Sequence, residues 1–117
     1  MIVWQSIEQL DKIVQDILKC IPKENYKIHN QIESSNDSIG SNFVEGYYAS
    51  SLGEYIKFIK YSRRSAAEIE LRVARVHSRN YIGDNLYEKF KARSAKTNYS
   101  IDQTRRSLEK KRNYNKK

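Results

Sequence analysis

Apolar residues recur at every third or fourth position through most of this chain, and this spacing constrains the fold more than any other feature. Such spacing places side chains on one face of an α-helix, whereas a half-buried β-strand requires strict alternation. Residues 3–21 show it most clearly, at Val3, Ile7, Leu10, Val14, Ile17 and Ile21. The same spacing predicts three more helices, at about residues 25–48, 51–80 and 84–108.

Boundary signals separate the predicted helices. Pro22 stops the first helix, because proline lacks the amide that the helix needs. Ser51 followed by Glu54 forms a capping box at the start of the third helix. Gly83 predicts a turn, and Asp84 predicts the N-cap of the fourth helix. Four helices joined by short loops predict an all-α fold, an antiparallel up-down-up-down four-helix bundle.

The fourth helix is expected to dock least firmly. Its inward positions include Ser94, Thr97 and Thr104, so it buries less apolar surface than the other helices. After Leu108 the apolar pattern ends, and the remaining residues have too little apolar content to offset the entropy of ordering. We therefore expect the bundle to occupy residues 1–108 and residues 109–117 to form a basic, frayed tail.

Charge is distributed unevenly along the chain. The 117 residues carry a net charge of +8. Residues 1–60 contain six Lys and eight acidic residues, a net charge of −2, whereas residues 61–117 contain sixteen Lys and Arg and six acidic residues, a net charge of +10. A strongly basic chain favours polyanionic partners such as RNA or DNA. We expect a polyanion to contact the second half of the chain.

The sequence offers no set of residues for enzymatic chemistry. Its single Cys20 and its two histidines, His29 and His77, form no recognisable metal site, and no cofactor motif is present. Cys20 is expected to be a core residue. Paired carboxylates, a nucleophile with a base and a glycine-rich phosphate loop are also missing. No apolar run approaches about 18 residues, so we expect a cytoplasmic protein without a membrane segment.

One side of the third predicted helix carries a row of cations, which we call the basic row. Arginine suits phosphate because its planar guanidinium donates two hydrogen bonds in fixed geometry. The alternative is a solvated face on which Glu68 pairs with Arg64 and Arg72. The predicted nucleic-acid-binding residues are Lys57, Lys60, Arg64, Arg72, Arg75 and Arg79.

Several tyrosines flank the loop between the second and third helices. We expect their rings to lie in the core or in a subunit interface, where an amphipathic ring is favoured. The alternative is a platform on which unpaired bases stack. The residues concerned are Tyr47, Tyr48, Tyr55 and Tyr61.

Polar residues also recur at helical spacing near the end of the second helix. We interpret them as a structural network facing Ser62 and Ser65, which would fix helix register. Gly46 is expected to end the helix with a left-handed cap. The network comprises Ser35, Ser38, Asn42 and Glu45.

Four segments of the chain form a recognisable ordered set: Val3-Trp4-Gln5, residues 38–46 (SIGSNFVEG), residues 54–59 (EYIKFI) and residues 65–70 (SAAEIE). Together they resemble a known family, the small proteins encoded within intervening sequences of bacterial 23S ribosomal RNA genes. The resemblance implies a four-helix bundle, assembly as a ring-shaped homopentamer and no established enzymatic chemistry. The chain departs from the usual pattern at Gly40, where proline is frequent, and at Arg64, where glycine is frequent.

Two functional hypotheses follow. The first is a non-enzymatic oligomeric bundle that binds RNA or other nucleic acid through the basic row and the fourth helix. The second is a protein-interaction scaffold, a homopentameric ring that presents residues 47–61 to another protein, such as a nucleic-acid enzyme.

Overall fold

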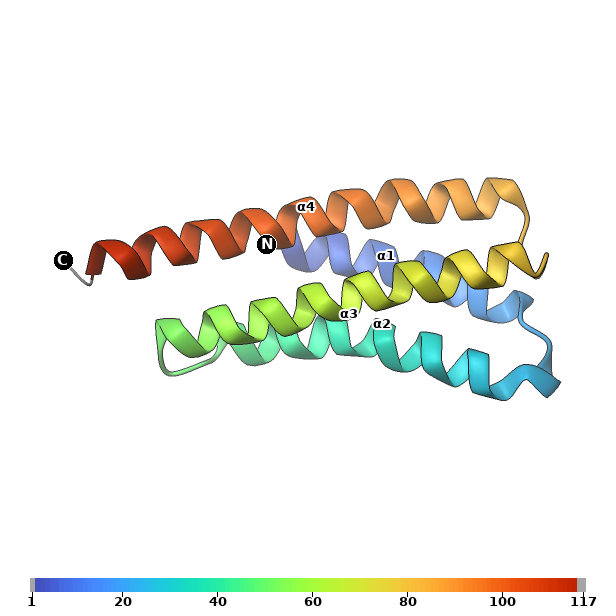
Figure 1. The fold of residues 1–117 in the computed structure, drawn as a ribbon, viewed down its shortest axis with the longest axis horizontal. Coiled ribbons are helices and arrows are strands. Elements are labelled where there is room, and N and C mark those ends of the chain that lie inside the picture. The colour runs from blue at the N-terminus through green and yellow to red at the C-terminus, as the bar shows by residue number, and fades with distance from the viewer. Residues whose placement is uncertain (1, 116–117) are drawn as a thin grey trace.

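Four long α-helices make up nearly all of the computed structural model, which describes residues 2–115. They are α1 (Ile2–Cys20), α2 (Tyr26–Tyr47), α3 (Leu52–Ser78) and α4 (Asp84–Asn115), with a short 3-10 helix, η1 (Lys23–Asn25), before α2. Figure 1 shows that successive helices run in opposite directions, and each packs on its neighbours in the order α1, α2, α3, α4 and back to α1. This confirms the predicted antiparallel up-down-up-down bundle.

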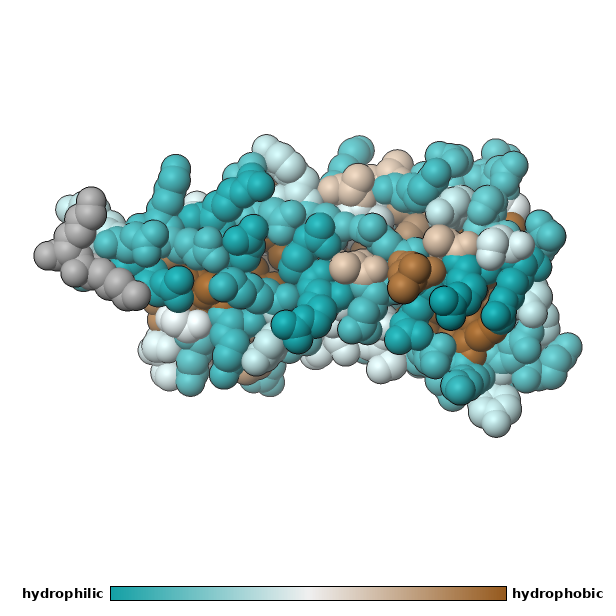
Figure 2. Space-filling model, in the orientation of Figure 1, coloured by the Kyte–Doolittle hydropathy of each residue, from teal (hydrophilic) through white to brown (hydrophobic). Residues whose placement is uncertain are grey.

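The apolar stripe of each helix faces a common core. Leu10 of α1, Ile39 of α2, Ile69 of α3 and Ile101 of α4 are almost completely buried. Helices with one apolar stripe gain most of their stability from burying that stripe against one another. Figure 2 shows the result, a mostly hydrophilic surface on which hydrophobic residues are visible chiefly between helices.

The turns use some of the predicted signals and replace others. Ser51 Oγ accepts a hydrogen bond from the Glu54 amide at 3.2 Å, as a capping box requires. The turn after α3 depends on Asn80, whose φ of 63° is left-handed, rather than on Gly83. The Tyr81 amide then donates to the Val76 carbonyl at 3.2 Å, which satisfies a carbonyl at the end of α3.

Helix α4 is long but buries little apolar surface. Among its buried residues, Ser94, Thr97 and Asn98 are polar and only Phe90 and Ile101 are apolar, in agreement with the expected weak apolar stripe. Its length differs from expectation, because the helix continues past Leu108 to Asn115 where we predicted a frayed tail. The last two residues of that tail, 116–117, lie outside the described residues.

The helices differ in length, and this gives the two ends of the bundle different compositions. Helix α1 has 19 residues and α4 has 32. Figure 1 shows that α1 begins part of the way along the long axis, so the end that carries the α2–α3 turn consists of α2, α3 and the last turns of α4. Within residues 2–115, none of the helices is long and apolar enough to span a bilayer.

Candidate nucleic-acid interface

The basic row lies on the solvent side of α3. Wholly buried residues such as Ile59, Ala66 and Val73 fix the opposite face of this helix against the core, and the cations therefore point outward. Arg72 is the exception, since its side chain is only 34% exposed. The exposed members are Lys57, Lys60, Arg64, Arg75 and Arg79.

Some members of the basic row already have partners. Lys60 Nζ lies 3.8 Å from Glu109 Oε1 of α4, and Arg72 lies 4.0 Å from Glu68 Oε2. Arg64 lies over the ring of Tyr61, 5.6 Å from its centroid, and forms no ion pair with Glu68 within the described chain. The alternative of a self-neutralised face therefore holds for Arg72 but not for Arg64.

Arg75 and Arg79 have the least occupied guanidinium groups of the row. Neither makes an ion pair with a carboxylate of residues 2–115. Both are exposed and one turn apart, so their side chains project to the same side of α3. Two unpaired arginines at this spacing suit adjacent phosphate groups.

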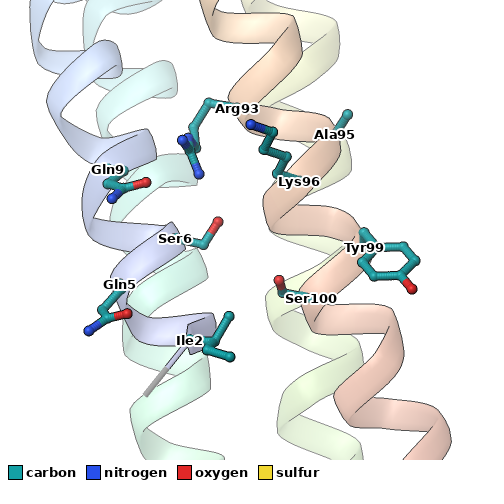
Figure 3. A pocket seen from close by; sticks show the side chains of 9 residues that line it. All are labelled: Ile2, Gln5, Ser6, Gln9, Arg93, Ala95, Lys96, Tyr99 and Ser100. Atoms are coloured by element: carbon teal, nitrogen blue, oxygen red, sulfur yellow. The ribbon is translucent and has the colours of Figure 1, made fainter.

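A second cationic surface lies between α1 and α4. An open groove of about 480 Å³ separates these helices, and Arg93 extends across it from α4 toward α1, with Lys96 beside it (Figure 3). Below the groove, Ser6 and Thr97 share a buried hydrogen bond of 2.7 Å. The sequence indicated a basic fourth helix without identifying these two residues, because the weak apolar stripe of α4 left its inward face poorly defined.

Polar side chains hold α4 beside α3. Arg63 Nε donates to Asp102 Oδ1 at 3.1 Å, and Glu70 Oε1 accepts hydrogen bonds from Ser94 Oγ, at 3.0 Å, and from Asn98 Nδ2. Hydrogen bonds to a charged carboxylate are stronger than those between neutral groups. These contacts place the two cationic helices side by side even though α4 buries little apolar surface.

The structure excludes the core, one of the two expected locations, for most of the tyrosine rings. Tyr48 is 79% exposed, Tyr47 is 50% exposed and Tyr61 is 38% exposed, so these rings do not belong to the core of the chain. We call these three residues the tyrosine surface. Only Tyr55 packs against the core, and its burial, together with the nearby Tyr47, raises the pKa of its phenol.

The predicted polar network forms only in part. Asn42 Nδ2 donates to the Ser38 carbonyl at 2.9 Å, a bond within α2 rather than between helices. Two side-chain hydrogen bonds join α2 to α3: Ser35 Oγ donates to Glu68 Oε2 at 3.4 Å, and Ser62 Oγ donates to the Ile39 carbonyl at 2.7 Å. Ser65 is buried but makes none of the side-chain hydrogen bonds found in residues 2–115, so Ser35 and Ser62, and not Ser65, link the two helices.

The roles predicted for Glu45 and Gly46 are wrong. Glu45 is exposed and lines a groove between α1 and α2, on the side of α2 away from Ser62 and Ser65. Gly46 lies inside α2 with a negative φ, so it forms no left-handed cap. A β-carbon at Gly46 would lie 3.0 Å from the Phe58 β-carbon and 3.3 Å from the Tyr55 carbonyl oxygen. Gly46 is therefore needed for the close approach of α2 and α3.

The groove between α1 and α2 is acidic, in contrast to the surface of α3 and α4. It has a volume of about 640 Å³, and we call it the acidic groove. Its carboxylates come from Glu8, Asp11, Asp37 and Glu45. Asn36 Nδ2 donates to Asp11 Oδ1 at 2.6 Å. Burial, and then the charges of Glu33 and Asp11, raise the pKa of Asp37 above its usual value. These carboxylates make the groove unfavourable for a polyanion.

Residues that commonly perform catalysis are dispersed. No group of three or more His, Cys, Asp or Glu side chains within residues 2–115 is arranged to hold a metal ion. His77 Nε2 lies 2.7 Å from Asp84 Oδ1, and its ring stacks on Tyr87, so it joins α3 to the start of α4. Cys20 is exposed, which corrects its expected place in the core. It is the last residue of α1.

Comparison with known proteins agrees with the fold. A solved structure from Bacteroides thetaiotaomicron, described as a protein of unknown function from the S23 ribosomal protein family, superimposes with a TM-score of 0.79. It is 22% identical and covers 87% of this chain and 96% of its own. No curated protein matches the sequence significantly. The sequence model of the 23S rRNA-intervening sequence proteins matches residues 1–107. The chain therefore belongs to the 23S rRNA-intervening sequence protein family.

Proposed function

We propose that this protein is a non-enzymatic helical bundle that binds RNA or other nucleic acid, mainly through phosphate groups. The observation that carries the proposal is the pair Arg75 and Arg79, exposed and without a carboxylate partner in the described chain, within a row of further cations. Binding through phosphates depends strongly on salt and weakly on sequence, because bound cations displace condensed counterions. Arg93 and Lys96 extend the cationic surface onto α4.

Titration into labelled single-stranded RNA, duplex RNA and duplex DNA tests the proposal. At about 50 mM salt we expect saturable binding that weakens steeply at about 200 mM salt. The variant Arg75→Glu/Arg79→Glu should weaken binding by at least about tenfold and flatten the salt dependence, because each lost phosphate contact removes close to one unit of slope. Arg72 is unsuitable for reversal, because its half-buried side chain pairs with Glu68.

The matched control reverses two exposed cations elsewhere. Lys19→Glu/Lys23→Glu produces the same change in net charge, but both residues lie at the turn between α1 and α2. A surface-specific interaction should tolerate this control. Equal loss of affinity in both variants would show that binding depends only on the net charge of the protein. Retained affinity in a folded Arg75→Glu/Arg79→Glu variant would exclude this surface.

A second function, a homopentameric protein scaffold, is favoured by the charge asymmetry of the bundle. The acidic groove lies on α1 and α2, whereas the basic row lies on α3, so two copies can make a head-to-tail contact between unlike surfaces. Repeated head-to-tail contacts close into a ring when the rotation permits. Light scattering during gel filtration should then give the mass of five chains, and co-purification of a defined protein after nuclease treatment would favour the scaffold over nucleic-acid binding.

A further inference from the structure

The tyrosine surface exposes aromatic rings that the fold does not use for its own packing. Tyr47 and Tyr48 meet edge to face, with centroids 5.1 Å apart and an interplanar angle of 83°. The half-buried Tyr55 also meets Tyr47 edge to face, with ring centroids 6.5 Å apart and an interplanar angle of 80°. In an edge-to-face contact the edge of one ring meets a face of the other, so the contact with Tyr47 can cover at most one face of the exposed Tyr48 ring.

Cations lie beside the next two aromatic rings of α3, Phe58 and Tyr61. Lys57 Nζ lies 5.2 Å from the centroid of Phe58, and the guanidinium of Arg64 lies 5.6 Å from the centroid of Tyr61. Phe58 and Tyr61 in turn meet at 5.9 Å and 89°. Rings and cations therefore alternate along the first half of α3, which gives a surface with both π-faces and positive charge within a few ångströms of each other.

The end of α4 adds further positive charge at the same end of the bundle. Lys60 of α3 contacts Glu109 of α4 at 3.8 Å, which brings the last turns of α4 close to the start of α3. Figure 1 shows α4 continuing past the first turn of α3. Lys110 and Lys111 are exposed on these turns, and Tyr114 is 79% exposed.

A single-stranded nucleic acid suits this combination. Its unpaired bases stack on aromatic rings while its phosphates meet nearby cations, whereas the bases of a duplex are already stacked on each other and inaccessible. Tyrosine and arginine also suit protein interfaces, but the cores of such interfaces are depleted in lysine, so Lys57 among these rings favours a nucleic acid. We propose that the tyrosine surface binds single-stranded RNA or DNA by stacking unpaired bases on Tyr47, Tyr48 and Tyr61, with Lys57 and Arg64 holding the adjacent phosphates. This inference rests on the proposed nucleic-acid binding and adds to it a preference for unpaired bases.

The decisive probe is a strand that keeps its phosphates and lacks its bases. A labelled RNA of about twelve nucleotides, its duplex, and an abasic strand of equal length are each titrated at about 50 mM salt and followed by fluorescence anisotropy. The natural single strand should bind at least about fivefold more tightly than the abasic strand, since each stacked base adds measurable affinity. Equal affinity for the two strands overturns the inference and leaves the rings as a protein contact, while salt-dependent binding still supports the proposed function.

Ring substitutions test the same point within the protein. Tyr48→Ala should weaken single-strand binding about fivefold or more and leave abasic-strand binding unchanged, whereas Tyr48→Phe should bind like the wild type. The matched control is Tyr26→Ala, because Tyr26 is 70% exposed and lies at the start of α2, at the other end of the bundle. Equal losses in Tyr48→Ala and Tyr26→Ala would overturn the inference. If none of the three nucleic acids binds, both the proposed function and this inference are wrong.

Discussion

Helix α2 makes a close interface with α3 and an open interface with α1, and two glycines mark the difference. A β-carbon at Gly46 would meet α3 at distances as short as 3.0 Å. A β-carbon at Gly40 would lie 3.6 Å from Trp4 and 3.7 Å from Ile7 of α1, which is ordinary van der Waals contact. Packing therefore requires a glycine at position 46 and does not require one at position 40. The neighbours of a helical glycine decide whether a larger residue would fit.

The two interfaces also differ in their polar groups. Between α2 and α3, the wholly buried Ser62 donates one hydrogen bond across the interface. Between α1 and α2, carboxylates line an open groove, and mutual repulsion contributes to the raised pKa of Asp37. We infer that α2 and α3 form the firmer pair and that changes of similar size should have different effects at the two interfaces.

The largest expected effect comes from adding a methyl group at the close interface. Gly46→Ala should lower the free energy of unfolding by up to about 2 kcal/mol. The new β-carbon would crowd α3 at 3.0–3.3 Å, which costs about 1–3 kcal/mol, and the gain in helix propensity offsets about 1 kcal/mol of that cost. Urea denaturation measures the change. A midpoint equal to or above that of the wild type would show that α2 and α3 are not tightly packed there.

Removing the buried hydroxyl at the same interface should have a smaller effect. Ser62→Ala loses the hydrogen bond to the Ile39 carbonyl, which is worth about 0.5–1.5 kcal/mol. Ser34→Ala is the matched control, because Ser34 is exposed on α2. If thermal unfolding gives both variants the same midpoint, Ser62 does not stabilise the α2–α3 interface.

The same methyl group should have the opposite effect at the open interface. Gly40→Ala should raise the free energy of unfolding by about 0.5–1 kcal/mol, because alanine favours the helix and restricts the unfolded chain, and there is space for its side chain. Chemical denaturation of this variant beside Gly46→Ala compares the two interfaces directly. A destabilised Gly40→Ala variant would mean that α1 lies closer to α2 than described.

The smallest effect concerns charge in the acidic groove. Because the pKa of Asp37 in the folded protein is raised from 3.8, ionisation of this carboxyl costs stability above that raised pKa. The cost disappears as the pH falls through the raised pKa. Asp37→Asn should therefore slightly raise the melting temperature at neutral pH, and the difference from the wild type should vanish in acid. The effect is small because the side chain is exposed and water screens its neighbours. An Asn variant that melts lower at neutral pH would contradict this sign.

The sequence predicted the helices well, because burial of one stripe leaves a strong periodic signal in residues such as Leu10 and Ile69. It placed the end of α4 too early at Leu108. Residues 109–115 are helical without an apolar stripe, since lysine, arginine and glutamate favour helices and Arg105 pairs with Glu109 one turn later at 3.3 Å.

The candidate site was less predictable than the fold, because it depends on which residues of neighbouring helices each side chain contacts. Spacing correctly identified the exposed side of α3, but it did not reveal which cations have carboxylate partners on α4, as Lys60 does. Nor could spacing show that Gly46 faces another helix at close range, or that Tyr47 and Tyr48 lie beyond the last layer of the core. These are properties of neighbouring helices, and periodicity within one helix does not report them.

The exposed thiol of Cys20 gives the molecule a natural attachment point. It is the only cysteine in the sequence, and it lies at the α1–α2 end of the bundle, away from the turn that carries Tyr47 and Tyr48. A maleimide dye at this position labels each chain once and lies at the opposite end of the bundle from Tyr47 and Tyr48. Counting photobleaching steps per particle would then give the number of chains in an assembly, both alone and with a strand of RNA bound.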